Sequence, residues 1–286
     1  MRAALALATA LGVTACSSGG DDVRGASLAS TGSVGVVQIE RSGTAARADS
    51  SEHRAELNAV FARYRGLEGQ DALELLGVGR AGPETDSCAL VSPPPVQPDA
   101  DAIVELLDVG TLEVRVGDSR AHVAPRVFPE LGALVAGSFY AKDAELVEAR
   151  ADRDTYRVVA TGGEEVEPFE VEVVAPAAPD EVSIGGFAPD ERPVLGRDDE
   201  IVVVWDAGDP GDRIDLTLAA GSTVIECVAR DDGMLQIPAD VLSEIDTDPD
   251  ARLVMRRVRV QPFDAPGLEA AWADLISTRT IAVDVR

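Results

Sequence analysis

Short segments in which apolar and polar residues alternate recur along the chain, and this period of two constrains the fold more than any other feature. Leu112, Val114 and Val116 alternate with charged residues, and residues 169–173 repeat the pattern. Alternate side chains of a strand point to opposite faces of its sheet, so these segments predict strands with one buried face. Further strands are predicted at residues 34–39, 156–161, 201–205, 214–218, 224–229, 234–237, 253–260 and 278–285. We therefore predict a mainly β protein.

Residues 55–65 fit two structures. Leu57, Val60, Phe61 and Tyr64 recur at the spacing of one helix face, whereas the surrounding segments are predicted strands. We favour a strand, because it gives a consistent sandwich. A helix of one or two turns is predicted at residues 238–242, which begin with proline.

Residues 175–180 interrupt the strand pattern with the sequence Ala-Pro-Ala-Ala-Pro-Asp. Proline cannot donate to a central sheet, so this segment predicts a short, stiff domain boundary. We expect an N-terminal β-rich domain at residues 33–175 and a C-terminal domain at residues 181–286. The short strands of the second domain and one buried tryptophan, Trp205, favour an immunoglobulin- or fibronectin-like sandwich. The expected fold is two tandem β-sandwich-like domains with one or two short helices.

The N-terminal segment has the features of an export signal. Residues 3–15 are uncharged and mostly apolar, and the small residues Val-Thr-Ala precede Cys16. This stretch is too short for a membrane-spanning helix, which needs about 20 apolar residues. We interpret residues 1–15 as a lipoprotein signal peptide and residues 16–32 as the lipidated Cys16 followed by a flexible tether. Two or more acyl chains, such as palmitate, on Cys16 would anchor the protein stably to a membrane.

Ser17 directly follows the cysteine. In the lipoproteins that this signal resembles, Asp at that position favours retention in the inner membrane. We therefore expect a lipid-anchored, extracytoplasmic protein of the outer membrane.

Several segments follow one another in a fixed order: Gly-Gly-Glu-Glu-Val-Glu-Pro-Phe at 162–169, Ala-Pro at 175–176, an apolar strand ending in Trp205, a strand carrying Cys227, and Ile-Pro at 237–238. This order resembles a pattern from uncharacterised cell-surface lipoproteins of high-GC bacteria, over about residues 100–286. The resemblance implies tandem immunoglobulin- or fibronectin-like β-sandwich domains behind a lipid anchor. It brings no catalytic motif to this sequence, whose acidic loops are longer.

Two cysteines, Cys88 and Cys227, remain once Cys16 carries lipid. Outside the cytoplasm such thiols can pair. A disulfide would join the two expected domains, and the alternative is two separate thiols that pack as small hydrophobic groups.

The charge and the motifs exclude several functions. The net charge of −26 repels nucleic acid and anionic lipid headgroups. The two histidines, His53 and His122, cannot form a three-histidine zinc site and lack the spacing of a His-Glu-x-x-His motif. The Gly-x-Ser-x-Gly turn of serine hydrolases is absent from the sequence. We expect no catalytic residue and no organic cofactor.

Calcium is the ligand that the acidic loops make most credible, because it takes six to eight oxygen atoms. The cluster of Asp246, Asp248 and Asp250 begins like an EF-hand loop, but it has Ala251 in place of the glycine and Arg257 in place of the final glutamate. Solvated acidic loops are the alternative. The candidate calcium ligands are Asp206, Asp209 and Asp212, Asp246, Asp248 and Asp250, with Asp231 and Asp232 as a smaller pair.

Aromatic residues make up 4% of the chain, which is few for a carbohydrate-binding protein. We expect Trp205 to lie in a core strand. Trp272 falls in an expected loop or short helix, and it is the aromatic candidate for binding.

The expected function is a non-catalytic binding or structural module, with another envelope protein as its partner. The alternatives are an extracytoplasmic hydrolase with a carboxylate site between the domains and a calcium-dependent adhesion module. An enzyme should show a deep pocket that holds carboxylates with displaced pKa values. A binding module should instead show an exposed apolar patch or a free sheet edge.

Overall fold

The structure, a computed structural model, describes residues 31–42, 52–78, 82–91, 102–128, 135–147, 154–189 and 191–286. The expected signal peptide, Cys16 and almost all of the expected tether lie outside these residues. Two helices are described, α2 (Gly69–Leu75) and α3 (Ala239–Leu242), and the other elements are strands. Within the described ranges, no helix is both long and apolar enough to cross a membrane.

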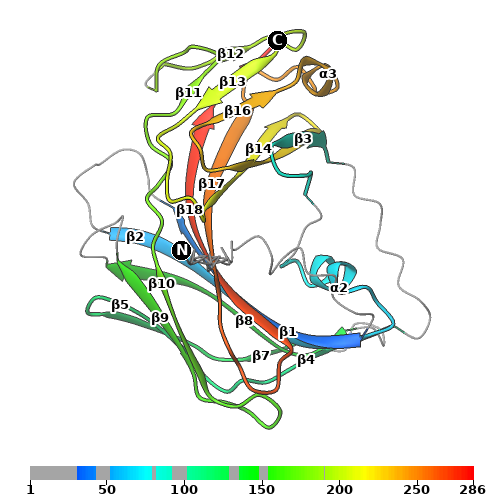
Figure 1. The fold of residues 1–286 in the computed structure, drawn as a ribbon, viewed down its shortest axis with the longest axis vertical. Coiled ribbons are helices and arrows are strands. Elements are labelled where there is room, and N and C mark those ends of the chain that lie inside the picture. Colours follow the sequence, from blue (N-terminus) through cyan, green and yellow to red (C-terminus); the bar gives the residue numbers. More distant parts are fainter. Residues whose placement is uncertain are drawn as a thin grey trace, which may run out of the picture.

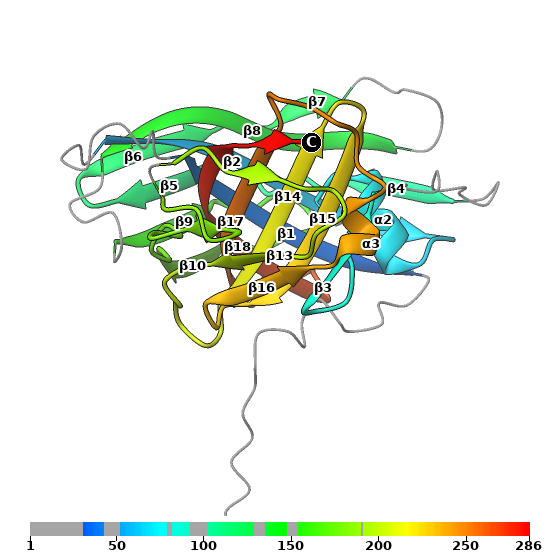
Figure 2. The same cartoon turned by 90° about the horizontal axis from the view of Figure 1, so that it is seen from above.

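A nine-stranded sheet runs through the whole molecule (Figures 1 and 2). Neighbouring strands are antiparallel, except that β1 pairs with β18 and β4 pairs with β8 in parallel. In spatial order the strands are β15 (Thr223–Arg230), β14 (Arg213–Ala220), β17 (Arg252–Pro262), β18 (Ala270–Ala282), β1 (Thr31–Ser42), β2 (Glu52–Arg65), β4 (Ile103–Leu106), β8 (Val135–Val147) and β7 (Arg126–Phe128).

Smaller sheets cover parts of the long sheet. A four-stranded sheet contains β10 (Phe169–Val174), β9 (Thr155–Ala160), β5 (Leu112–Val116) and β6 (Ser119–Val123). A three-stranded sheet contains β11 (Ser183–Ile184), β13 (Ile201–Val204) and β16 (Met234–Ile237). The remaining strands are β12 (Val194–Leu195), paired with β19 (Asp284–Val285), and β3 (Ser87–Leu90), which contacts β15. The prediction of a mainly β protein of the sandwich class is confirmed.

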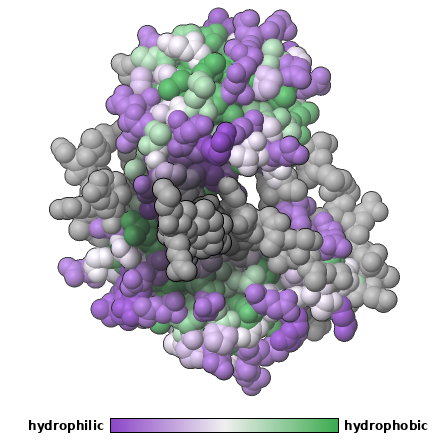
Figure 3. Space-filling view, viewed as in Figure 1, coloured by the Kyte–Doolittle hydropathy of each residue, from purple (hydrophilic) through white to green (hydrophobic). Residues whose placement is uncertain are grey.

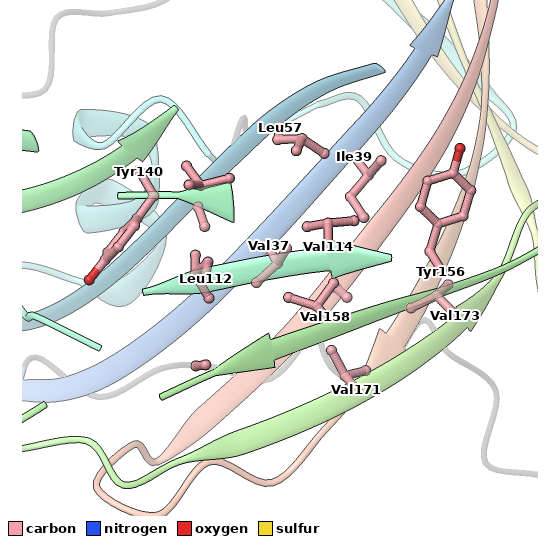
Figure 4. Packing of buried hydrophobic residues seen from close by; sticks show 14 of the residues in the cluster. Val37, Ile39, Leu57, Leu112, Val114, Tyr140, Tyr156, Val158, Val171 and Val173 are labelled. Atoms are coloured by element: carbon pink, nitrogen blue, oxygen red, sulfur yellow. The ribbon is translucent and has the colours of Figure 1, made fainter. Parts of the chain in front are cut away.

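Three hydrophobic clusters hold these layers together. We call the lower sandwich the part in which β1 and β2 pack against the four-stranded sheet, at the bottom of Figure 1. There, Val37 and Ile39 of β1 point toward the four-stranded sheet, where they meet Val114 and Val158 (Figure 4). We call the upper sandwich the part in which β14, β15 and β17 pack against the three-stranded sheet, at the top of Figure 1. The third cluster lies on the opposite face of β1 and β2, where helix α2 packs. The alternation of side chains along each strand therefore supplies both faces of the sheet with apolar residues.

The expected boundary at residues 175–180 separates two cores, but both expected domains contribute to one sheet. Except for Cys88, the residues of the upper cluster lie between positions 182 and 285. The long strand β18 nevertheless pairs with β17 along one side and with β1 along the other. The two sandwiches are thus built on a continuous sheet.

The expected strand at residues 55–65 is confirmed as part of β2. Leu57 and Phe61 face the lower core, whereas Ala62 and Tyr64 face the cluster around α2. Because both faces of β2 are buried, apolar residues fall on both sides of the strand and imitate a helical spacing. The helix predicted after Pro238 is also present, as α3.

Candidate functional site

The outer face of the three-stranded sheet is the strongest candidate for a binding surface. Val204 of β13 lies directly opposite Met234 of β16. Their side chains are 41% and 61% exposed, and Met234 has the highest exposure among the described large hydrophobic residues. Val202, which is half-buried, lies on the same face of β13. Figure 3 shows hydrophobic residues at the surface of the upper sandwich.

The alternation along the two strands explains why these side chains reach the surface. Ile201 and Val203 of β13 fill the upper core, together with Leu235 and Ile237 of β16. Their neighbours must then point outward. A cross-strand pair of apolar side chains on a sheet face offers contact area without a cavity, which suits a protein surface better than a small ligand. We refer to Val202, Val204 and Met234 as the outer apolar face.

The first acidic cluster is occupied by an arginine. Asp212 accepts hydrogen bonds from Arg259 at both carboxylate oxygens, each at 2.7 Å, and Asp209 also pairs with Arg259. The hydrogen bond to Asp212 is the main reason why the pKa of Arg259 lies above its usual value. The backbone carbonyl of Asp206 accepts a hydrogen bond from Arg257. The structure therefore brings Asp209 and Asp212 together around a guanidinium group.

The second acidic cluster clasps the turn between β14 and β15. Asp246 accepts hydrogen bonds from the N–H and the hydroxyl of Ser222, at 2.9 and 2.8 Å. Asp248 accepts the N–H groups of Gly221 and Asp250. These backbone donors lower the pKa of Asp246 and Asp248. Asp250 forms an ion pair with Arg192 at 3.3 Å. The carboxylates of this cluster therefore stabilise a loop contact.

The smaller acidic pair separates into a buried and an exposed residue. Asp231 is buried, accepts a hydrogen bond from Trp205 Nε1 at 2.7 Å and forms an ion pair with Arg257 at 2.6 Å. Asp232 is exposed. In the described part of the chain, no group of three or more His, Cys, Asp or Glu side chains is arranged to hold a metal ion.

Arginines fix the segment that was expected to be a domain boundary. Arg257 donates to the carbonyls of Ala177 and Ala178, and Arg41 donates to that of Pro176. Arg279 donates to the carbonyl of Pro179. Arg41 and Arg257 are themselves buried. Residues 176–179 are consequently held against the nine-stranded sheet where the two cores adjoin.

Cys88 and Cys227 form a disulfide. Although Cys88 belongs to the expected N-terminal domain, β3 lies beside β15 in the upper sandwich, and Cys88 packs against the upper core. The bridge therefore ties β3 to the sheet.

The expectation for Trp272 was wrong. Trp272 lies within strand β18, is 2% exposed and packs in the cluster that contains Val36 and Tyr64. The small residues around it resembled a loop or a helix, but β18 is a central strand with both faces covered, and small side chains suit that position. Trp205 is buried in the upper core, as predicted.

The described histidine side chain is exposed. His122 is on the outer face of β6, 3.2 Å from a carboxylate oxygen of Glu113. The side chain of His53 lies outside the described residues.

A surface hollow of about 400 Å³ lies at the turn between β17 and β18, within residues 262–271. Its lining includes the apolar side chains of Phe263 and Leu268 and the carboxylates of Asp264 and Glu269, with no histidine, serine or cysteine. The Ser33 hydroxyl lies beside this lining, where it accepts the backbone N–H of Glu269 at 3.0 Å.

No protein-family model, curated protein or solved structure matches this chain. The candidate surface therefore rests on the geometry described above.

The sequence pattern predicted the strands of the outer apolar face but not the face itself. Residues 201–205 are a continuous apolar run, which does not reveal which side chains point outward. The pairing with β16 supplies that information.

Proposed function

We propose that this chain is a lipid-anchored protein of the cell envelope, at the outer membrane and facing away from the cytoplasm. The observation that carries the proposal is the apolar stretch of residues 3–15 that ends in small residues before Cys16. Residues 17–30 then provide a spacer between the anchored cysteine and β1.

The Cys88–Cys227 disulfide supports an extracytoplasmic location. Disulfides persist in oxidising compartments and are rare where cellular reductants keep thiols reduced. The bridge is therefore consistent with export, and it comes from residues far from the N-terminal signal.

We further propose that the protein acts as a non-catalytic binding module for another envelope protein. The exposed Val204–Met234 pair supports this role, because the free energy falls when a partner covers an apolar sheet face and removes it from water. Exposed single apolar residues are common, but Val204 and Met234 lie opposite each other on one sheet face and form a continuous apolar surface.

Site-specific crosslinking in intact cells tests the binding role. A photoreactive residue at position 234 should yield a defined crosslinked partner, and Val204→Glu in the same chain should abolish that crosslink because it places a charge in the contact. A photoreactive residue at Ile103, which is also 41% exposed but lies on β4, is the matched control.

Equal crosslinking from positions 234 and 103, or a crosslink that survives Val204→Glu, would contradict the binding role. Circular dichroism of the purified Val204→Glu chain should match that of the unmodified chain, because residue 204 points away from the core.

A further inference from the structure

Carboxylates border the outer apolar face, and two of them come from the strand that carries Val202 and Val204. Alternate residues of a strand share one face of the sheet. The next residues of β13 in this phase are Glu200 and Asp206, just beyond the two ends of the strand. Both are exposed, whereas residues 201, 203 and 205 between them are buried. The alternation that exposes the two valines therefore also exposes a carboxylate at each end of them.

A third carboxylate lies beside the apolar pair on β16. Asp232 is exposed and stands two positions before Met234. The pairing of the two strands continues beyond Met234, because the N–H of Trp205 donates to the carbonyl of Gly233 at 3.0 Å. Asp206 and Asp232 therefore lie at the same end of the outer apolar face. Figure 3 shows hydrophilic residues around the hydrophobic ones at the surface of the upper sandwich.

These carboxylates are not neutralised by the strands that carry them. The outward positions of β11, β13 and β16 hold Ser, Val, Met and Gln, without lysine or arginine. The side chains of Glu200 and Asp206 form no ion pair with the described residues. Asp232 acts on Arg230 through space, but the Arg230 guanidinium already pairs with Asp86 at 2.7 Å. The outer apolar face thus has a negative border that a partner can neutralise.

We infer that the protein bound by the outer apolar face has an apolar contact surface bordered by lysine or arginine side chains. This inference rests on the binding role proposed above and specifies the chemistry of the partner. Apolar side chains of the partner cover Val204 and Met234, and its cations face Glu200, Asp206 and Asp232. Complementary charges at the border of an interface steer association and exclude wrong partners.

The same border disfavours two other occupants. In a two-fold contact with a second copy of this chain, the same surface meets itself, so carboxylates would approach carboxylates. An anionic membrane surface would repel them as well. Charge complementarity therefore selects a basic protein surface.

Methionine-methyl NMR of the chain 17–286, which includes every described residue, tests the inference with two defined probes. This chain contains two methionines, Met234, which is 61% exposed, and Met255, which is 0% exposed and serves as the internal control. The probes are short peptides of alternating leucine and lysine, or of alternating leucine and glutamate. We expect the leucine–lysine peptide to shift the Met234 signal alone, and the leucine–glutamate peptide to shift neither signal.

Neutralising the border should weaken this binding. Asp206→Asn/Asp232→Asn should raise the Kd of the leucine–lysine peptide about fivefold, as expected for the loss of two exposed ion pairs. Asp118→Asn/Asp264→Asn is the matched control, because it removes two exposed carboxylates from turns of the lower sandwich and should leave the Kd unchanged. An equal effect of the two double variants would assign the binding to overall charge and overturn the inference.

Three further results would overturn it. These are no shift of Met234 with the leucine–lysine peptide, an equal shift with the leucine–glutamate peptide, and a shift on raising the concentration of the chain alone, which would indicate a second copy. The crosslink from position 234 in cells separates this inference from the binding role. If that crosslink is lost in Val204→Glu but unchanged in Asp206→Asn/Asp232→Asn, the face binds a protein and the basic border is wrong. If no crosslink forms, the binding role itself fails.

Discussion

Replacing Arg257 with methionine should cause a large loss of stability, because it breaks an ion pair that is removed from solvent. The side chains of Arg257 and Asp231 are 2% and 0% exposed, and their charged atoms are 2.6 Å apart. Removing Arg257 leaves a buried carboxylate with no opposite charge beside it, which costs about 3–5 kcal/mol. The carbonyls of Ala177 and Ala178 lose their donor as well.

Urea unfolding followed by tryptophan fluorescence measures this loss, since Trp205 donates directly to Asp231. For a chain of this length an m value of about 3 kcal/mol/M gives a fall in the urea midpoint of about 1–1.7 M. Arg257→Met/Asp231→Asn should recover part of the loss, because no buried charge remains and the amide oxygen introduced at position 231 still accepts the tryptophan N–H.

Arg256→Met is the matched control. Arg256 is adjacent in sequence, 34% exposed, and pairs with Glu40 at 3.4 Å. A partly exposed pair is worth about 0–1 kcal/mol. If Arg257→Met destabilised the protein no more than Arg256→Met, the reasoning about the buried pair would be refuted.

Three further predictions concern the lower core and the acidic turn. Tyr140→Phe should cost about 1–3 kcal/mol in urea unfolding, because the Tyr140 hydroxyl accepts the N–H of Val109 and donates to Asp108, and a retained midpoint would contradict this role. Gly163→Ala should cost about 1–3 kcal/mol, since the new Cβ would lie 1.9 Å from the carbonyl oxygen of Asp108, whereas Gly211→Ala meets no atom within 4 Å and should be neutral. The folded-state pKa values of Asp246 and Asp248 are lowered, so their stabilisation should be complete above the ordinary value of 3.8 and be lost as pH falls through the folded values. Acid unfolding should therefore become less steep in Asp246→Asn/Asp248→Asn than in Asp264→Asn, and identical acid profiles would count against these hydrogen bonds.

The strands could be predicted from the sequence because alternation is a local signal. Residues 112–116 and 169–173 carry the pattern unambiguously, and they form β5 and β10. The pairing of β1 with β18 could not be predicted, because the partners are more than 230 positions apart and a parallel pair has no turn between its strands. The sequence did not predict that one sheet continues across the expected boundary at residues 175–180, for the same reason.

The candidate site was less accessible from the sequence than the fold. The aspartate clusters resembled calcium ligands by spacing, but the sequence did not show that Arg259 contacts Asp209 and Asp212. Trp272 was missed as a core residue because central strands accept small neighbours such as Ala271 and Ala273. The contact of Arg259 with the aspartates and the burial of Trp272 both arise between segments that are distant along the chain.

The lipid anchor is the central claim about function, and the mass of the mature N-terminus tests it most directly. The full sequence would be expressed in a bacterium, the membrane fraction isolated, and its N-terminal peptide analysed by mass spectrometry. We predict a peptide that begins at Cys16 and carries a diacylglyceryl or triacyl modification, and Cys16→Ser should abolish both the processing and the membrane association. A mature chain that begins at another residue, or that carries an unmodified Cys16, would contradict the account.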